Sequence, residues 1–399
     1  MRILFIAQAV SPHTARWISQ LQGQGWDIHL FDMLGSFPHA ELRGITEYSL
    51  LFPRKISPTK PIKYGHPFFL KYGLDPFPLS FVGFFTRRLF RNRVQQLVKV
   101  IRDIKPDVIH SMEMQAESYP LLEVLDLLGG KLPAPWVVST WGSDIYHFRK
   151  FPEHLEKIKK VLVNCNYLLP DCARDEVLAR ELGYKGSVPI ILPGAGGYSV
   201  SKMRSLIKEE VISKRRLIML KGYQGWAGRA LNAIEALEAC ADILKGYEIV
   251  IYLASPVLIP KVTSLQKSEK LNIRILPRSG PHQVILELFS QARIALAINQ
   301  TDGVPSAMLE AMTMGAFPIQ SDTESTAEWL THETNGLLVD PENVSSIEQA
   351  LRRALVDDIL VDVAAEVNFQ MISKKLDLTV VRPQVLEMYK SIATRAGRF

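Results

Sequence analysis

Residues 299–315 combine glycine, polar and acidic side chains in a pattern that suits a phosphorylated ligand rich in hydroxyl groups. The segment reads NQTDGVPSAMLEAMTMG and follows an apolar run at 294–298, which we expect to be a strand. A helix should begin near Ser306, after the loop residues Gly303, Val304 and Pro305. The first turn of a helix offers free backbone N–H groups and the positive end of the helix dipole, and both attract anions. The segment therefore predicts an anion site at Ser306.

Two carboxylates flank this expected anion site. Asp302 lies at its mouth, and Glu310 follows eight residues later. Each can accept hydrogen bonds from neighbouring hydroxyls of a ribose or a hexose. The alternative is that Asp302 only caps the helix and that Glu310 is a solvated helix residue, because acidic caps are common. The local pattern alone leaves both interpretations open.

The whole chain alternates short β-branched runs with amphipathic stretches. The strands that we expect are 3–6, 27–31, 108–111, 137–140, 167–170, 189–192, 217–220, 248–253, 273–276, 294–298 and 318–320. Near-continuous apolar strands separated by helices are typical of parallel sheets covered on both faces. We therefore predict an α/β protein of two doubly wound domains that face each other across a cleft.

The domain boundaries follow from where this alternation pauses and restarts. We place the first domain at 1–195, a linker at 196–214, the second domain at 215–375 and a helix that crosses back to the first domain at 376–399. A chain of 399 residues is too long for one ordinary core and suits two. The three cysteines form no C-x-x-C pair, no apolar run reaches the length of a membrane span, and the start does not read as a signal peptide. We expect a cytoplasmic protein.

Positive charge is concentrated in the first half of the chain. Residues 1–190 hold 24 Lys and Arg against 18 Asp and Glu, whereas the remaining residues hold 23 of each kind. Residues 54–105 alone carry 12 basic and two acidic side chains, with seven phenylalanines and the arginines Arg87, Arg88, Arg91 and Arg93. One interpretation is a surface that contacts anionic lipid, and the other is a helix packed on the sheet with solvated arginines. Nucleic acid is disfavoured, because no recognition motif accompanies the charge.

The spacing of Asp302 and Glu310 resembles the E-x7-E motif of retaining GT-B glycosyltransferases, with Asp in the first place. The flanking LEAMTMGAFPIQSD and NGLLVDPENVSSIEQAL are similar to the same region of glycosyltransferase family 4, often called group 1. The stretches MRILFIAQAVSPHTARWISQL, KPDVIHSMEMQ and VVSTWGSD resemble the acceptor domain of that family. The resemblance covers most of the chain. It implies a GT-B fold of two Rossmann-like domains, with the acceptor on the first and a nucleoside-diphosphate sugar, UDP favoured, on the second.

By this resemblance, Glu310 would bind the ribose hydroxyls of the donor. Asp302 would lie near the hydroxyls of the donor sugar, and the backbone of residues 303–306 would surround the diphosphate. The nucleotide base would be recognised near Arg278, largely through backbone groups. Because such groups leave little trace in residue identity, the base itself is not defined by the sequence.

Members of the family also place two basic residues after the first strand of the second domain, in a pattern like G-R-x5-K. Here the stretch LKGYQGWAGRAL puts Arg229 at the second basic position and Tyr223 at the first. Arg229 is expected to meet the charge that develops on the diphosphate as the sugar–phosphate bond breaks. The alternative for Arg229 is a solvated residue of a first helical turn. Lys221 is a further candidate, although its position does not match the motif.

The expected acceptor side carries a second departure from the family. Where the family often has a histidine, this chain has Trp141, in the stretch TWGSD that ends at Asp144, and His147 is the candidate substitute. His13 lies where the first strand yields to a helix, at a sheet edge of the kind that binds ligands. The alternative is a bystander histidine beside a helix cap at Thr14. We assign His13, Trp141, Asp144 and His147 to the acceptor side.

Other nucleotide and metal motifs are missing from the sequence. The glycines of residues 194–197 do not complete G-x-G-x-x-G, and no G-x-x-x-x-G-K-[ST] occurs, so we interpret these glycines as an interdomain turn. His110 is expected to be a packed core residue. No His, Asp or Glu grouping has the spacing of metal ligands, so neither a metal nor another cofactor is expected.

Together these features predict a retaining hexosyltransferase that moves a sugar from a nucleoside-diphosphate sugar to a hydroxyl of a saccharide. A lipid-linked acceptor in cell-envelope polysaccharide or glycan biosynthesis, and a peripheral position at the inner face of the membrane, are expected from residues 54–105. Two alternatives remain: a nucleotide-sugar epimerase of the same fold, and a non-catalytic sugar-nucleotide-binding subunit, which Tyr223 and Trp141 keep open. A periplasmic two-domain binding protein is disfavoured.

Overall fold

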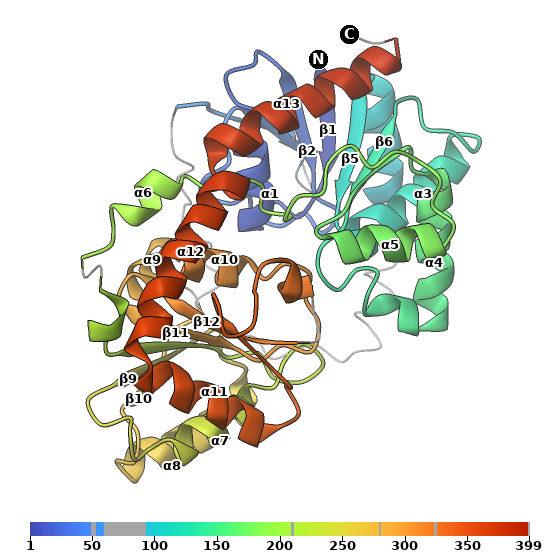
Figure 1. The fold of residues 1–399 in the computed structure, drawn as a ribbon. Coiled ribbons are helices and arrows are strands. Elements are labelled where there is room, and N and C mark those ends of the chain that lie inside the picture. The colour runs from blue at the N-terminus through green and yellow to red at the C-terminus, as the bar shows by residue number, and fades with distance from the viewer. Residues whose placement is uncertain (49–52, 60–92, 209–210, 279–280, 323–324, 398–399) are drawn as a thin grey trace, which may run out of the picture. The chain divides into compact units, whose positions relative to one another are not determined.

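Parallel strands form the centre of each half of the chain in this computed structural model, which describes residues 1–48, 53–59, 93–208, 211–278, 281–322 and 325–397 (Figure 1). The chain divides into two units, one of Met1–Gly197 with Val381–Phe399 and the other of Tyr198–Val380. Each unit contains its own sheet with helices between the strands. The prediction of two doubly wound α/β sheets is confirmed.

The first unit contains a seven-stranded sheet in the order β4-β3-β2-β1-β5-β6-β7. Its strands are β1 (Arg2–Ile6), β2 (Asp27–Phe31), β3 (Ile45–Tyr48), β4 (Pro53–Ile56), β5 (Val108–Met112), β6 (Trp136–Ser139) and β7 (Tyr167–Leu169). The pair β3 and β4 is antiparallel, and the others are parallel. The chain first moves outward from β1 to β2 and then returns to β5 on the other side of β1. The strand order therefore reverses between β1 and β5, which is where open α/β sheets bind ligands.

The helices of the first unit connect these strands. They are α1 (Pro12–Ser19), the π-helix η2 (Met114–Ser118), α3 (Tyr119–Leu127), the 3-10 helix η3 (Phe148–Lys150), α4 (Pro152–Asn164) and α5 (Ala173–Glu181), together with the helical residues 93–104. Val94, Leu97 and Ile101 of this last helix are buried. This part of the basic segment therefore packs on the sheet.

Arg93 differs from the expectation that it joins an exposed basic surface. Its side chain is buried, lies over the ring of Phe31 at 4.0 Å and donates to the carbonyl oxygens of Asp32 and Tyr48. Burial lowers the pKa of this guanidinium. The two carbonyl acceptors and the aromatic face explain how the charge is accommodated inside the unit. Arg87, Arg88, Arg91 and the phenylalanines of this segment lie outside the described residues.

The last helix, α13 (Leu378–Arg395), completes the core of the first unit (Figure 1). Its buried residues are Val381, Val385, Met388, Tyr389, Ile392 and Ala393, whereas Val380 is 37% exposed. The hydroxyl of Tyr389 accepts a hydrogen bond from Trp17 Nε1 at 2.9 Å and lies 2.6 Å from His110 Nδ1. His110 Nε2 lies 2.7 Å from Ser139 Oγ. Because the indole only donates, the phenol oxygen is the acceptor for Trp17, and the hydroxyls of Tyr389 and Ser139 lie against the two nitrogens of the buried imidazole.

The second unit contains a six-stranded parallel sheet in the order β10-β9-β8-β11-β12-β13. Its strands are β8 (Leu217–Lys221), β9 (Glu248–Tyr252), β10 (Ile273–Ile275), β11 (Ala292–Ala297), β12 (Phe317–Ser321) and β13 (Leu337–Val339). Its helices include α6 (Val200–Arg204), α7 (Ala230–Ala239), α8 (Ile259–Lys267), α9 (His282–Phe289), α10 (Ser306–Thr313), α11 (Val344–Val356) and α12 (Asp358–Leu376). Here the strand order reverses between β8 and β11.

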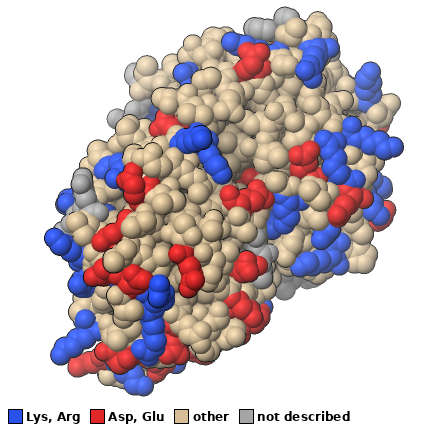
Figure 2. Space-filling model, viewed as in Figure 1, with Lys and Arg blue, Asp and Glu red and all other residues tan. Residues whose placement is uncertain are grey.

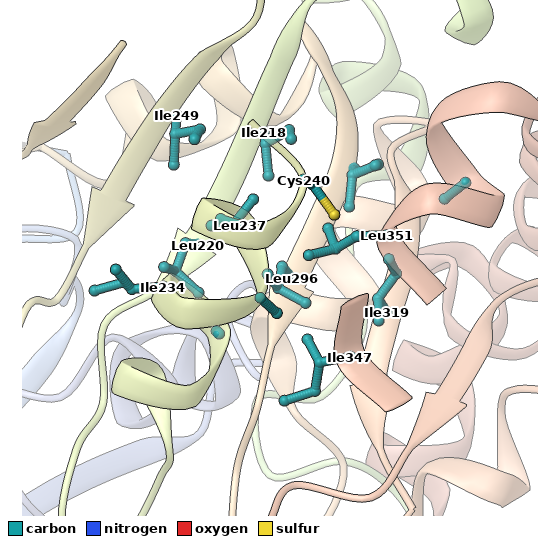
Figure 3. Close-up of a cluster of buried hydrophobic side chains, with 14 of the residues drawn as sticks. Ile218, Leu220, Ile234, Leu237, Cys240, Ile249, Leu296, Ile319, Ile347 and Leu351 are labelled. Atoms are coloured by element: carbon teal, nitrogen blue, oxygen red, sulfur yellow. The ribbon is translucent and has the colours of Figure 1, made fainter. Parts of the chain in front are cut away.

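Apolar side chains fill the space between this sheet and the helices α7 and α11 (Figure 3). Ile234 and Leu237 lie one turn apart on α7, and Ile347 and Leu351 lie one turn apart on α11, so each pair shares one helix face. They meet strand residues that are also buried, namely Ile218, Leu220, Ile249, Leu296 and Ile319. This packing holds the ends of β8 and β11 in place.

Three details of the predicted elements differ from the structure. Residues 189–192 are not a strand, since Pro189 has no N–H to donate and Pro193 follows at once. The short strands β3, β4 and β13 were not expected. The segment 196–214, expected as a linker, contains α6 and the 3-10 helix η4 (Ile212–Lys214).

The surface of the second unit carries charges of both signs. Arg352 pairs with Asp242, and Glu238 pairs with Lys261 and Lys270, and Figure 2 shows blue and red side chains interspersed over the part that holds α7, α8 and α11. This agrees with the balanced charge of the second half of the sequence. Within the described ranges, no helix has both the length and the apolar character that a membrane crossing requires.

We predict that Tyr389→Phe lowers the free energy of unfolding by about 2–4 kcal/mol, because Trp17 Nε1 and His110 Nδ1 both lose a buried partner. Urea unfolding followed by circular dichroism measures the change. Tyr167→Phe, at a half-buried tyrosine of β7, is the matched control and should cost less than about 0.5 kcal/mol. Equal losses in the two variants would contradict this role of Tyr389.

A second prediction concerns pH. Burial lowers the pKa of His110 to about 3, whereas an unfolded histidine titrates near 6.5. Between these values the unfolded chain binds one proton more, so His110 makes the folded state less stable as the pH falls, by about 1.4 kcal/mol per pH unit. His110→Gln removes this contribution. The stability difference between wild type and variant should therefore shrink below pH 6.5, and a difference that stays constant from pH 7 to pH 4 would exclude the assignment.

Candidate functional site

The strand reversal in the second unit places Lys221 beside Asp302. Lys221 is the last residue of β8, and Asp302 belongs to the loop after β11. The Lys221 Nζ lies 3.1 Å from Asp302 Oδ2, and the lysine side chain is only 7% exposed. The same ammonium lies 4.6 Å from the centre of the Tyr223 ring. A buried ammonium needs such partners to stay charged, so these three residues form one unit of the site.

Arg229 reaches the same sheet edge through its backbone. Its N–H donates to the carbonyl oxygen of Ile298 at 2.7 Å, and the preceding residue pairs with Asn299 in an isolated bridge. The guanidinium donates to Glu342 Oε1 at 2.7 Å and to the carbonyl oxygen of Gly225 at 2.5 Å. Arg229 therefore stands at the N-cap of α7 and pairs with Glu342 at the surface, so the alternative of a solvated residue stays open.

A glycine allows the chain to turn at the end of β8. Ala254 belongs to the loop after β9, and a Cβ atom at Gly222 would clash with its Cα at 2.6 Å. Only glycine permits this approach without a shift of the neighbouring strand. The turn brings Tyr223 next to Lys221 and starts the loop that ends at Arg229.

The loop before α10 has its expected position but a different cap. Pro305 occupies the N-cap, one residue before the first helical turn, and α10 begins at Ser306 without a side-chain cap. The Asp302 carboxylate instead accepts from the N–H of Gly303 at 3.1 Å and pairs with Lys221. The alternative role of Asp302 as the cap of this helix is therefore wrong. The Oγ of Ser325 donates to the carbonyl oxygen of Gly303 at 2.9 Å and fixes the loop from its other side.

Glu310 is a buried member of the site. It is 4% exposed, which excludes the alternative of a solvated helix residue, and its Oε1 lies 3.0 Å from His282 Nε2. His282 is the first residue of α9 and is 39% exposed at its side chain. Burial, and then the negative charge of Glu310, raises the pKa of the Tyr252 phenol at the end of β9. The site thus contains His282 and Tyr252, which the sequence analysis did not identify.

Arg278 is exposed and follows β10 by three positions. It precedes α9, the helix that starts with His282. The region expected to recognise the base therefore lies just before His282 in the sequence, and His282 contacts Glu310. Residues 279–280 of that region lie outside the described residues.

In the first unit, His13, the second residue of α1, lies next to Trp141, which belongs to the loop after β6. Their ring centres are 5.5 Å apart in an edge-to-face arrangement. The side chain that caps α1 is Ser11, whose Oγ accepts from the N–H of His13 at 3.2 Å, so the alternative cap at Thr14 is wrong. The indole of Trp141 lies against Gly194, where a Cβ atom would come within 2.6 Å of it. The glycine-rich turn therefore makes room for Trp141.

Asp144 is a buried residue that fixes the backbone at Trp141. Its buried carboxylate accepts from the N–H of Trp141 at 2.8 Å and from the N–H of Met114 at 2.9 Å, both at Oδ2. Burial, and then the charge of Glu113, raises the pKa of this group well above its usual range. Asp144 therefore positions the two loops that follow β5 and β6.

His147 lies in a different environment from His13. Its ring contacts Phe148 and Phe151, with ring centres 5.2 and 5.3 Å away. Burial, and then the charges of Lys150 and His154, lowers its pKa. Among the residues that the structure describes, no group of three or more His, Cys, Asp or Glu side chains is arranged to hold a metal ion.

Comparison with known families matches two segments of the chain. Residues 259–370 match the model described as "Glycosyl transferases group 1", which covers His282, Asp302 and Glu310. Residues 80–169 match the model described as "Glycosyl transferase 4-like", which covers Trp141, Asp144 and His147. No curated protein sequence matches the chain.

Solved structures of the GT-B fold resemble the whole chain. Sucrose-phosphate synthase from Thermosynechococcus elongatus superposes with a TM-score of 0.71 at 13% identity, over 99% of this chain and 100% of that one. HepE from Anabaena, in complex with UDP-glucose, gives 0.66 at 12% identity over 98% and 100%. A UDP-forming trehalose-phosphate synthase from Burkholderia xenovorans gives 0.65 at 14% over 98% and 99%. At these identities the likeness shows the fold.

We predict that Asp144→Ala lowers the free energy of unfolding by about 1–3 kcal/mol, because the N–H groups of Trp141 and Met114 lose their acceptor. The intrinsic fluorescence of the chain during urea unfolding measures the change. Asp126→Ala, at an exposed acid of α3, is the matched control and should have little effect. Similar small effects of both substitutions would mean that Asp144 does not hold these loops.

Proposed function

The chain belongs to the group 1 glycosyltransferases of the GT-B type, and from this premise we propose that it is a retaining enzyme that uses a UDP-sugar and glycosylates a hydroxyl of a saccharide. Transfer of a sugar from a nucleotide sugar follows from the family itself. The observation that carries the finer proposal is the group formed by Lys221, Asp302 and Tyr223 at the strand reversal of the second unit. Lys221 supplies positive charge next to Tyr223, which stands where the family pattern has its first basic residue.

The donor is assigned to the second unit. Glu310 accepts hydrogen bonds from the ribose hydroxyls, and His282 orients its carboxylate through the contact at 3.0 Å. The backbone of residues 303–306 and the start of α10 receive the diphosphate. Asp302 lies near the hydroxyls of the donor sugar. UDP is favoured over other nucleotides because similar structures are described in complex with UDP-glucose or as UDP-forming.

The chemistry follows from the charges at this edge. The bond between the anomeric carbon and the phosphate oxygen breaks, and the new bond to the acceptor oxygen forms on the same face of the sugar. The acceptor proton passes to the departing phosphate oxygen, so no side chain needs to act as a base. Lys221 and Arg229 stabilise the negative charge that grows on the diphosphate, because fixed cations in a partly buried place act strongly.

Lys221 also bears on the two alternatives. A non-catalytic subunit was kept open by Tyr223 at a basic position, yet the ring of Tyr223 lies against the ammonium of Lys221 two residues away. This contact supports an active site with the charge supplied from β8. An epimerase is distinguished by incubation of one UDP-sugar without acceptor, which would then yield a second UDP-sugar.

The acceptor is assigned to the first unit, with His13, Trp141 and Asp144 at its carboxyl edge. A lipid-linked saccharide, a role in cell-envelope polysaccharide or glycan biosynthesis, and peripheral membrane contact are supported by the basic and aromatic composition of residues 54–105. Most of these residues, 60–92, lie outside the described ranges. Composition is therefore the argument for this part of the proposal.

We predict that UDP raises the melting temperature of the wild type and that GDP, ADP, CMP and dTDP raise it less. A ligand at 100 times its dissociation constant adds about 2.7 kcal/mol to the stability of the folded state. Glu310→Ala should lose most of this stabilisation, because the ribose loses its acceptor. Glu287→Ala, at an exposed position of α9, should respond like the wild type. No stabilisation by any of the five nucleotides would overturn the donor assignment.

Retention gives a further prediction. When the enzyme slowly hydrolyses UDP-glucose in the absence of acceptor, the glucose first released should be the α anomer. Proton NMR of the anomeric region, recorded before mutarotation is complete, distinguishes the two forms. Initial release of the β anomer would contradict the proposed front-face displacement.

A further inference from the structure

Gln8 and Glu113 occupy the strand reversal of the first unit. Gln8 follows β1 by two positions, Glu113 follows β5 directly, and these two strands are hydrogen-bonded neighbours. Gln8 Nε2 donates to Glu113 Oε2 at 2.9 Å, and both residues are half-buried. Ligands of open α/β sheets bind outside the carboxyl ends of the strands at this point. Neither residue has a role in the proposed function so far.

The backbone of Glu113 is unusual. Its φ of 97° and ψ of 146° lie close to a region that glycine adopts and other residues rarely do. The residue is the N-cap of the π-helix η2, and its Oε1 accepts from the N–H of Ala116 at 3.4 Å. Glycine would form the same turn without strain. The backbone conformation of this turn therefore does not select a carboxylate, and the side chain adds the hydrogen bonds from Ala116 and Gln8.

A buried carboxylate connects the segment of Glu113 to Trp141. Asp144 Oδ2 accepts from both Trp141 and Met114, the residue after Glu113. One buried carboxylate thus ties Trp141 to the loop of Glu113. Trp141 in turn contacts His13, which follows β1 as Gln8 does. A carboxylate that accepts from hydroxyls and an indole that packs on C–H groups are together suited to a sugar ring.

We propose that Glu113, aligned by Gln8, accepts hydrogen bonds from hydroxyls of a neutral sugar ring of the acceptor. This inference rests on the proposed function. The ring is neutral because the position is acidic: Glu113 itself, and the buried Asp144, whose carboxylate accepts from the N–H of the next residue, Met114. A phosphorylated ring at this point would meet carboxylates. Burial raises the pKa of Glu113, in agreement with a group that is shielded from bulk water.

The test measures UDP release by the full-length protein from UDP-glucose, UDP-galactose and UDP-N-acetylglucosamine. Glucose, mannose, galactose and N-acetylglucosamine are added singly at about 100 mM, and glucose 6-phosphate is added in parallel. At least one neutral sugar should accelerate UDP release by the wild type. In Glu113→Gln and Glu113→Gly, its KM should rise at least tenfold while the affinity for UDP stays within twofold. Glu123→Gln, at an exposed position of α3, should behave like the wild type.

The glycine variant distinguishes binding from a structural role. If Glu113 serves the acceptor, Glu113→Gly loses the stimulation but melts at or above the wild-type temperature, because the strained backbone is relieved. If both variants melt lower and keep the wild-type KM, Glu113 only caps η2 and the inference is wrong. It is also wrong if no neutral sugar, or only glucose 6-phosphate, accelerates UDP release by a protein that binds UDP. Failure of the wild type to bind UDP would instead overturn the proposed function.

Discussion

The burial of one lysine ammonium at the end of a central strand governs the site of the second unit. Lys221 is 7% exposed, and a charge in such a place is tolerated only when groups of opposite sign or an aromatic face surround it. Asp302 and Tyr223 supply both. The turn at Gly222 and the loop before α10 must therefore hold their shapes for the lysine to stay charged. In the proposed donor site, the diphosphate would meet a cation whose position is already fixed.

The sheet edge of the first unit depends on a different interaction. The hydroxyl of Tyr389 joins Trp17 of α1 to His110 of β5, and His110 continues to Ser139 of β6. These bonds tie the end of the chain to the three elements that surround the strand reversal. His13 belongs to α1, and Glu113 and Trp141 follow β5 and β6 in the chain. The last helix thus supports the region to which the acceptor is assigned.

The sequence predicts the fold well because alternation of apolar strands and amphipathic helices is a local property. The strands at 27–31 and 108–111 agree with β2 and β5 to within one residue. The strands β3 and β4 were not predicted because each has only four residues and two of these are adjacent polar residues, Thr46 and Glu47 in β3 and Arg54 and Lys55 in β4. A strand was predicted at 189–192 because these residues are apolar, but Pro189 and the adjacent Pro193 have no N–H to donate to a neighbouring strand.

Only part of the candidate site could be predicted from the sequence. The spacing of Asp302 and Glu310 and the loop between them are local and were predicted, and the structure adds that both carboxylates have partners. Lys221 and Asp302 are separated by 81 positions, so no spacing rule links them, and only the neighbouring positions of β8 and β11 bring them together. The contact between His282 and Glu310 is of the same kind. Asp144 was assigned from its neighbours, and its hydrogen bonds to two backbone N–H groups could be seen only in three dimensions.

The central claim is that the second unit binds a nucleoside diphosphate through the charge of Lys221. Calorimetric titration of UDP and of uridine into the wild type and into Lys221→Met tests it most directly, with Lys245→Met, at an exposed lysine, as the matched control. We expect Lys221→Met to lower the affinity for UDP at least tenfold and to leave the much weaker affinity for uridine unchanged. The control should match the wild type. Equal affinity of wild type and Lys221→Met for UDP would contradict it.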